Sequence, residues 1–315
     1  MLNLVKSIKK PWVSEEIPPA DGCGGVNCNL LLRKETRYMD NRPIGFFDSG
    51  LGGLTCISPL LSAMPNERII YFGDTARTPY GSKAPSTIKT FSLQIADFLV
   101  QRNVKMIVIA CNTVSAVCLT ELQERYPDIP IVGIIRPAAE KVALTCSKDN
   151  SVGIISTKVT YNSGVYEKLI HQLAPDFPLH AIPCPTLVPL IEEGIIENEI
   201  MDLSIQYYMD HFLTYHKIDT LILGCTHYPL IRENISKLYP SLDIIDPSRE
   251  IAGHVQKKLI ESDLLAQDSN FENTFYASDL SENFVNMINR IFEIGKFRVA
   301  FKNLDLDIYE GGDGQ

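Results

Sequence analysis

Two cysteines, Cys111 and Cys225, follow short apolar runs that resemble each other. The first stretch reads MIVIACNTVSAV (106–117) and the second reads TLILGCTHYPLI (220–231). In each stretch an apolar run ends in a small residue, and the cysteine comes next. A lone cysteine after a buried strand is usually a small core residue. A matched pair therefore needs a reason beyond packing.

The residues just after the two cysteines carry hydroxyl, amide and imidazole groups. They are Asn112, Thr113, Thr226 and His227. Polar side chains gathered past the end of a buried strand are typical of a ligand site rather than of a packed core. We therefore interpret these two cysteines as functional. We interpret four others as small core residues: Cys56, Cys118, Cys146 and Cys184.

Two matched thiols fit inversion of a carbon centre better than nucleophilic catalysis or redox chemistry. A nucleophilic thiol needs one cysteine and a base, and a redox pair usually lies close in sequence. Inversion of a carbon centre needs a base that removes a proton from one face and an acid that delivers a proton to the other. A thiolate and a thiol on opposite sides of a substrate could act as this base and this acid, and they would exchange roles when the reaction runs in reverse. A free thiol has a pKa of about 8.5, so the thiolate needs a favourable neighbour, for which His227 is a candidate.

Short apolar runs alternate with helical patterns through most of the chain. The runs predicted to be buried strands are 44–47, 69–72, 106–110, 131–135, 152–155, 221–223 and 244–245. Residues 86–101 and 199–216 repeat apolar side chains with the period of a helix, and Ser86 is the expected N-cap of the first. This alternation predicts an α/β fold with mainly parallel sheets flanked by helices.

A weak internal repeat predicts two similar domains. IGFFDSG (44–50) and VGIISTKVT (152–160) each open with a strand that carries Gly and then Ser, and each precedes one cysteine segment. Ligands bind at the carboxyl ends of strands in open α/β sheets. Both cysteines should therefore face one cleft between two pseudo-symmetric domains. We expect the first domain to comprise 43–138 plus 254–302, and the second to comprise 139–253.

The two ends of the chain and its net charge bear on which classes of protein the sequence could belong to. Residues 1–42 are expected to form an irregular N-terminal arm and 303–315 a flexible tail. The net charge of −9 argues against a general nucleic-acid binder, and no apolar run approaches the roughly 20 residues of a membrane-spanning helix. No secretory signal follows the early lysines, so we expect a cytoplasmic protein with reduced thiols. Cys23 and Cys28 lack matching partners, which makes zinc a weak alternative.

Several segments, taken in order, resemble the signature segments of glutamate racemase, in the aspartate/glutamate racemase superfamily. They are IGFFDSGLGGLT, YFGDTARTPYGSK, ACNTVSA and LILGCTHYPLI, with PTLVPLIEEG and IIDPSREIA as weaker matches. The resemblance spans roughly residues 43–295. It implies two α/β domains and cofactor-independent interconversion of L- and D-glutamate by two cysteines. It also implies that D-glutamate is supplied for peptidoglycan synthesis.

The resemblance assigns roles to individual residues. It makes Cys111 the thiol that takes the proton from D-glutamate and Cys225 the thiol that takes it from L-glutamate. It implies catalytic assistance from Asp48, from His227 and from a glutamate, for which we favour Glu192 over Glu193. It implies substrate-binding roles for a larger set, namely Asp48, Ser49, Tyr80, Gly81, Asn112, Thr113, Thr226 and His227. No metal site is implied.

Other functions stay open at this point. A racemase of aspartate or another acidic amino acid would use the same pair of thiols, and a non-catalytic protein could keep the cleft to bind an acidic ligand. A cysteine hydrolase would leave the second cysteine without a role. The expected partner is glutamate as a small-molecule substrate, with no nucleic acid or membrane, and a homodimer is a possible assembly. The segment IIRPAA departs from the family, which often has an acidic residue where Arg136 stands.

Overall fold

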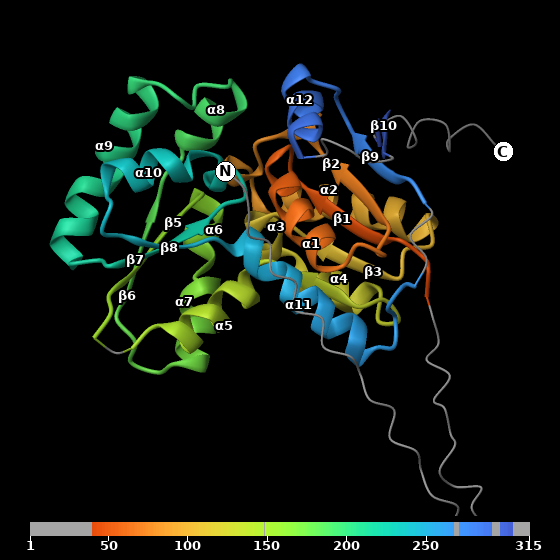
Figure 1. Cartoon of the computed structure of the whole chain (residues 1–315), viewed down its shortest axis with the longest axis horizontal. Coiled ribbons are helices and arrows are strands. Elements are labelled where there is room, and N and C mark those ends of the chain that lie inside the picture. The colour runs from red at the N-terminus through yellow and green to blue at the C-terminus, as the bar shows by residue number, and fades with distance from the viewer. Residues whose placement is uncertain (1–39, 148, 268–270, 292–296, 305–315) are drawn as a thin grey trace, which may run out of the picture. The chain divides into compact units, whose positions relative to one another are not determined.

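The computed structural model describes residues 40–304, apart from 148, 268–270 and 292–296 (Figure 1). All of the described residues fall within one compact unit, Tyr38–Gln315. The predicted arm over 1–42 and tail over 303–315 lie almost entirely outside the described residues. Cys23 and Cys28 lie outside them as well.

The first sheet has six described strands, in the order β10-β9-β2-β1-β3-β4. They are β1 (Ile44–Asp48), β2 (Ile69–Gly73), β3 (Met106–Ile109), β4 (Ile131–Gly133), β9 (Asn273–Ala277) and β10 (Phe297–Phe301). Neighbouring strands pair in parallel throughout. Strands β1 to β4 are fully buried, as expected when helices cover both faces of a parallel sheet.

The second sheet has four described strands, also parallel, in the order β6-β5-β7-β8. They are β5 (Val152–Ser156), β6 (Leu179–Pro183), β7 (Thr220–Gly224) and β8 (Asp243–Ile245). This order repeats that of β2-β1-β3-β4 in the first sheet. Strand β1 is therefore equivalent to β5, and β3 to β7, which accounts for the repeat in the sequence. Cys111 and Cys225 follow the equivalent strands β3 and β7.

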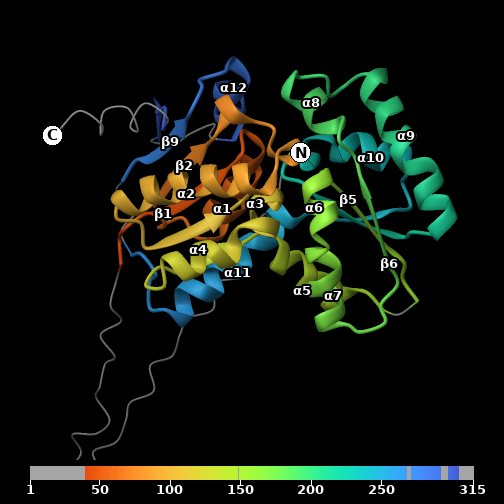
Figure 2. The same cartoon turned by 180° about the vertical axis from the view of Figure 1, so that it is seen from behind.

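Helices flank both sheets (Figures 1 and 2). Their bounds are α1 (Ile57–Ala63), α2 (Pro85–Gln101), α3 (Asn112–Val117), α4 (Leu119–Arg125), α5 (Ile135–Thr145), α6 (Lys158–Ser163), α7 (Val165–Leu173), α8 (Leu187–Glu192), α9 (Glu199–His216), α10 (Arg232–Leu238), α11 (Pro247–Glu261) and α12 (Glu282–Ile291). Apolar residues of α2, α3 and α4 pack together on one face of the first sheet. Those of α8, α9 and α10 pack together on one face of the second sheet.

A single hydrophobic cluster joins the remaining faces of the two sheets. It contains Phe46 and Val108 from the first sheet, Ile154 and Ile222 from the second, and Val255 from α11. Full burial of such a side chain stabilises the folded state by about 1.5–3 kcal/mol. The two sheets therefore share part of one core, which holds the ends of β3 and β7 in a common framework.

The α/β fold predicted from the sequence is confirmed, with corrections at particular elements. The run 131–135 is a strand only to Gly133, because Ile135 already begins α5. Ser86 is not an N-cap. Helix α2 begins at Pro85, whose fixed φ suits the first helical turn, and Ala84 before it makes no side-chain cap.

Three strands were not predicted. Strand β6 (LHAIP) lies at the edge of its sheet and is half-buried, and β9 (NTFYA) and β10 (FRVAF) carry polar residues. None of them has the continuous apolar run of a fully buried strand. The proposed domain boundaries stay a prediction, although β9 and β10 pair within the first sheet.

Candidate active site

Cys111 and Cys225 line one cavity of about 170 Å³. The other predicted residues that line it are Ser49, Tyr80, Gly81, Asn112, Thr113, Thr226 and His227. Asp48 and Glu192 do not line it, and each contacts residues that do. The structure thus gathers residues from the ends of β1, β3 and β7 at one place, as the parallel topology requires.

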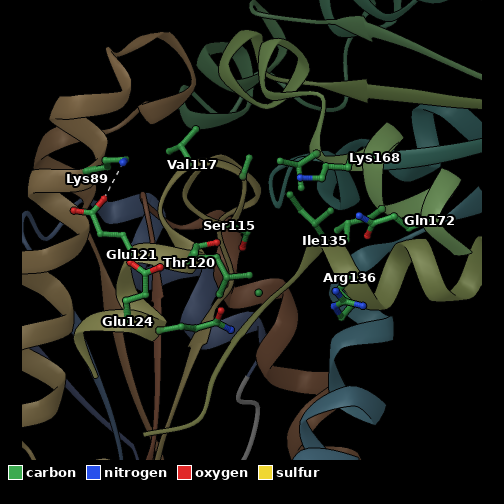
Figure 3. A pocket seen from close by; sticks show the side chains of 16 residues that line it. Lys89, Ser115, Val117, Thr120, Glu121, Glu124, Ile135, Arg136, Lys168 and Gln172 are labelled. Carbon is green, nitrogen blue, oxygen red and sulfur yellow. Dashed lines mark ion pairs between the residues drawn. The ribbon is translucent and has the colours of Figure 1, made fainter. Parts of the chain in front are cut away.

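A larger cavity, of about 800 Å³, lies elsewhere and holds none of the predicted residues (Figure 3). Ser115 and Val117 of α3 line one side of it, and Arg136 and Lys168 line another. Its Lys89 and Glu121 pair with each other at 2.8 Å. Size alone would select this cavity, but polar and titratable groups converge in the smaller one, which we take as the candidate site.

Cys111 sits between the end of β3 and the first turn of α3, with 3% of its surface exposed. Its Sγ donates a hydrogen bond to Ser49 Oγ at 3.6 Å. Burial, and next the negative charge of Asp48, raise the pKa of the Cys111 thiol to about 12. At neutral pH Cys111 is therefore a thiol and a potential proton donor.

Cys225 has a basic neighbour where Cys111 has a hydroxyl group. His227 Nδ1 lies 3.8 Å from Cys225 Sγ, and His227 Nε2 lies 2.5 Å from Glu192 Oε1. Burial alone would lower the pKa of His227, but the hydrogen bonds and negative charges of Cys225 and Glu192 hold it well above its ordinary value. His227 is thus an imidazolium at neutral pH, and a cation at this distance stabilises negative charge on the sulfur.

The carboxylate of Asp48 is buried and fully engaged by protein donors. Its Oδ2 accepts hydrogen bonds from the backbone N–H groups of Gly50 (3.1 Å) and Gly53 (3.0 Å). Its Oδ1 accepts one from Thr226 Oγ1 at 3.2 Å, which links the ends of β1 and β7. Asp48 therefore shapes the loop after β1 and acts on Cys111 through its charge, rather than lining the cavity.

Tyr80 and Gly81 form the side of the cavity that meets the second sheet. The Tyr80 hydroxyl donates to Asp74 Oδ2, so it is held by the protein itself. Asp74 also accepts a hydrogen bond from Arg77 Nε at 2.7 Å, so its carboxylate joins two side chains of this segment. A Cβ on Gly81 would lie 2.5 Å from Thr157 Cβ, so only glycine permits this approach.

Asn112 offers a hydrogen-bond donor to the site. Its Oδ1 accepts from the Tyr166 hydroxyl at 2.7 Å, whereas its buried Nδ2 has no hydrogen-bond partner among the residues that the structure describes. An unpaired buried donor costs about 1–3 kcal/mol, so a ligand oxygen would be favoured here. Thr113 Oγ1 lies 3.0 Å from Thr157 Oγ1, which joins α3 to the end of β5.

Several lining residues were not predicted from the sequence. They are Pro79, Ser82, Thr157, Pro185, Val188 and Pro189. The internal repeat could have identified Thr157, because it follows β5 as Ser49 follows the equivalent strand β1. The prolines and Val188 give no such signal, since an apolar residue does not by itself indicate a ligand site; Val188 and Pro189 lie in α8.

The described residues offer free thiols but no cluster of side chains that could bind a metal ion. Between 40 and 304, apart from the stated gaps, no group of three or more His, Cys, Asp or Glu side chains is placed to hold a metal ion. The six described cysteines are free thiols. None of the described helices has the length and apolar character needed to cross a membrane.

The family model for Asp/Glu/hydantoin racemase matches residues 54–255, which is more than half of the chain. The chain belongs to this family. Among curated relatives, the glutamate racemase of Neisseria meningitidis is 42% identical over 240 residues, covering 76% of this chain and 88% of the relative. That of Geobacter metallireducens is 41% identical over 251 residues, covering 79% and 92%.

Solved structures of this racemase family share the fold. Glutamate racemase from Francisella tularensis, in complex with D-glutamate, has a TM-score of 0.78 and 40% identity, covering 85% of this chain and 99% of that one. A Bacillus anthracis glutamate racemase also has a TM-score of 0.78, with 34% identity and coverage of 84% and 98%. The resemblance to glutamate racemase inferred from the sequence segments is confirmed.

Proposed function

We propose that this chain is a glutamate racemase that interconverts L- and D-glutamate and supplies D-glutamate for peptidoglycan synthesis. The observation that carries this proposal is that Cys111 and Cys225 follow equivalent strands and line one cavity. Inversion at a carbon centre needs an acid and a base that reach opposite faces of it. The relatives named above as glutamate racemases, and the D-glutamate bound to one of them, support glutamate as the substrate.

The resting charges set the direction of the first proton transfer. Cys225, beside the His227 imidazolium, acts as the base and takes the α-proton of L-glutamate. Cys111, a buried thiol, delivers its proton to the opposite face of the carbanion, which gives D-glutamate. In the reverse direction the thiols exchange roles, and the substrate ammonium group would favour the thiolate of Cys111.

The remaining residues hold the substrate while only its α-proton changes sides. Asn112 Nδ2, a buried donor with no partner among the described residues, binds a carboxylate oxygen. Ser49, Thr113 and Thr226 add hydroxyl groups, and the backbone at Tyr80–Gly81 closes the other side. Glu192 orients His227 and stabilises its charge, and Asp48 acts from behind the cavity wall.

The proposed reaction needs no cofactor, because thiols supply both the acid and the base. The proposal includes a cytoplasmic location, which the free thiols of the described cysteines support. Association into a homodimer stays a prediction, which light scattering of the purified protein would measure.

Circular dichroism of amino-acid solutions tests the proposed function. The purified chain, treated with EDTA and supplied with no cofactor, should abolish the signal of L-glutamate with time and leave that of L-aspartate unchanged. Loss of the L-aspartate signal instead would identify an aspartate racemase. No change in either signal, although isothermal titration detects glutamate binding, would indicate a non-catalytic binding protein. Activity that returns only with a divalent ion or pyridoxal phosphate would contradict the two-thiol mechanism.

A further inference from the structure

His227 and Glu192 come from segments that flank the second sheet, but both side chains pack against the loop that follows β1 of the first sheet. Nδ1 of His227 lies 2.6 Å from the position that a Cβ of Gly52 would take. Oε1 of Glu192 lies 3.0 Å from the corresponding position at Gly50. Both glycines follow β1, so the loop after β1 forms a wall for the pair. The present arrangement of the pair therefore depends on how the two sheets meet.

Helix α12 makes a second contact of this kind. Nδ2 of Asn283 donates a hydrogen bond of 2.7 Å to the backbone carbonyl of Glu192. Glu192 is the last residue of α8, where the carbonyl groups lack partners within the helix. Asn283 thus satisfies a carbonyl at the end of α8, and it reaches across from an element that follows β9 of the first sheet (Figures 1 and 2).

The start of α12 is well anchored, which holds the backbone that carries Asn283. Ser281 Oγ accepts from the backbone N–H of Phe284 at 3.2 Å, which caps the helix. Phe284 and Ile288 are fully buried in the cluster shared by the two sheets. Asn283 itself is exposed, so its side chain contributes little to the core.

Resting on the proposed racemase function, we infer that Asn283 is a positioning residue for the Cys225 half of the reaction. It holds the end of α8, which places the Glu192 carboxylate against His227 and His227 against Cys225. The Cys111 half has no such dependence. Its partner, Ser49, follows β1 in the same sheet as Cys111 and makes no contact with α8 among the described hydrogen bonds.

The test must measure proton removal from each enantiomer separately. Steady-state racemisation cannot do so, because the two directions share an equilibrium constant of one and their kcat/KM values change together. Elimination of HCl from threo-3-chloroglutamate needs a single proton removal. The α-proton passes to a thiolate, its electron pair forms a double bond between the α- and β-carbons, and chloride leaves. The L-configured compound reports on Cys225 and the D-configured compound on Cys111.

Asn283→Ala should lower elimination from the L-configured compound about three- to tenfold, as expected for one hydrogen bond. Elimination from the D-configured compound should change less than about twofold. Asn283→Gln, which keeps an amide donor, should restore most of the lost rate. Asn286→Ala, at an exposed position on the same helix, is the matched control and should equal the wild type.

Equal loss on both compounds, or unchanged elimination from the L-configured one, would overturn the role of Asn283. Failure of Asn283→Gln to recover more rate than Asn283→Ala would overturn it too. These outcomes are distinct from failure of the proposed function, in which the wild-type protein itself would neither racemise glutamate nor eliminate HCl. Thermal unfolding of the variants, expected to match the wild type, separates positioning from loss of folded protein.

Discussion

Cys111 and Cys225 occupy equivalent positions after β3 and β7, yet their neighbours differ in charge. Cys111 donates to the Ser49 hydroxyl near the carboxylate of Asp48, whereas Cys225 faces a protonated His227. The shared backbone plan places the sulfurs on one cavity. The different neighbours give one sulfur a proton and favour negative charge on the other, which two identical halves could not do.

The difference also avoids an electrostatic conflict. Negative charge on Cys225 helps to raise the pKa of Cys111, so a thiolate at Cys225 keeps Cys111 protonated. Two thiolates in a buried cavity would repel each other, and two thiols would leave no base. The repeated fold thus places the two sulfurs on one cavity. The difference between their neighbours makes one sulfur an acid and the other a base.

Removing either thiol should produce the largest effect. Cys111→Ser and Cys225→Ser should each lower racemisation by at least about a thousandfold, because a serine hydroxyl is a far weaker acid than a thiol. The residual elimination of HCl from threo-3-chloroglutamate should differ between the two. Cys225→Ser should favour the D-configured compound and Cys111→Ser the L-configured one. Near wild-type racemisation by either variant, or the same preference in both, would contradict the two-thiol assignment.

Removing the partner of His227 should produce an intermediate effect confined to one half. Glu192→Gln should lower elimination from the L-configured compound about ten- to hundredfold, the range expected for a hydrogen bond between charged groups. The D-configured compound should be much less affected. Glu193→Gln is the matched control, since Glu193 is exposed and makes no described side-chain contact with His227. A larger effect from Glu193→Gln would transfer the assisting role to that residue.

The smallest expected effect is a difference in pH dependence between the stability that His227 contributes and the stability that Cys111 contributes. Both His227 and Cys111 have folded-state pKa values above their ordinary ones, so the stability that each contributes is complete at low pH and lost as pH rises. For His227 the loss begins above its ordinary value, about 6.5, and for Cys111 above about 8.5. Urea unfolding should show the difference between wild type and His227→Asn shrinking from about pH 6.5 upward.

The corresponding difference for Cys111→Ala should stay constant up to about pH 8.5 and shrink only above it. A His227→Asn difference that grows with pH would mean that His227 is neutral in the folded protein. The whole assignment of an imidazolium beside Cys225 would then be wrong.

The sequence was sufficient to predict those parts of the site that follow directly from strand ends. Cys111, Asn112, Cys225 and Thr226 each come just after an apolar run, and parallel strands place such residues at one edge of a sheet. Ser49 was assigned to the site through the resemblance to glutamate racemase. The fold class was predictable because fully buried strands appear as continuous apolar runs.

The remaining features depend on contacts between distant residues. Asp48 and Thr226 are 178 positions apart, and Asn283 and Glu192 are 91 apart. The engagement of the Tyr80 hydroxyl by Asp74 could not be read from a turn-rich segment, although the two are close in sequence. Strands β9 and β10 were missed because polar residues, Asn273 and Thr274 in β9 and Arg298 in β10, interrupt their apolar runs. The roles of the individual site residues stay predictions until the variants above are measured.

The strand order of the first sheet has a consequence for the nascent chain. Strand β2 pairs with β1 on one side and with β9 on the other, and β9 is made only after the whole second sheet. During synthesis the sequence IIYFG of β2 is therefore an open, apolar sheet edge for some 200 residues. Such an edge is a template for pairing with other chains. We therefore expect truncations that remove β9 to leave the edge of β2 unpaired and to aggregate more readily than the full chain.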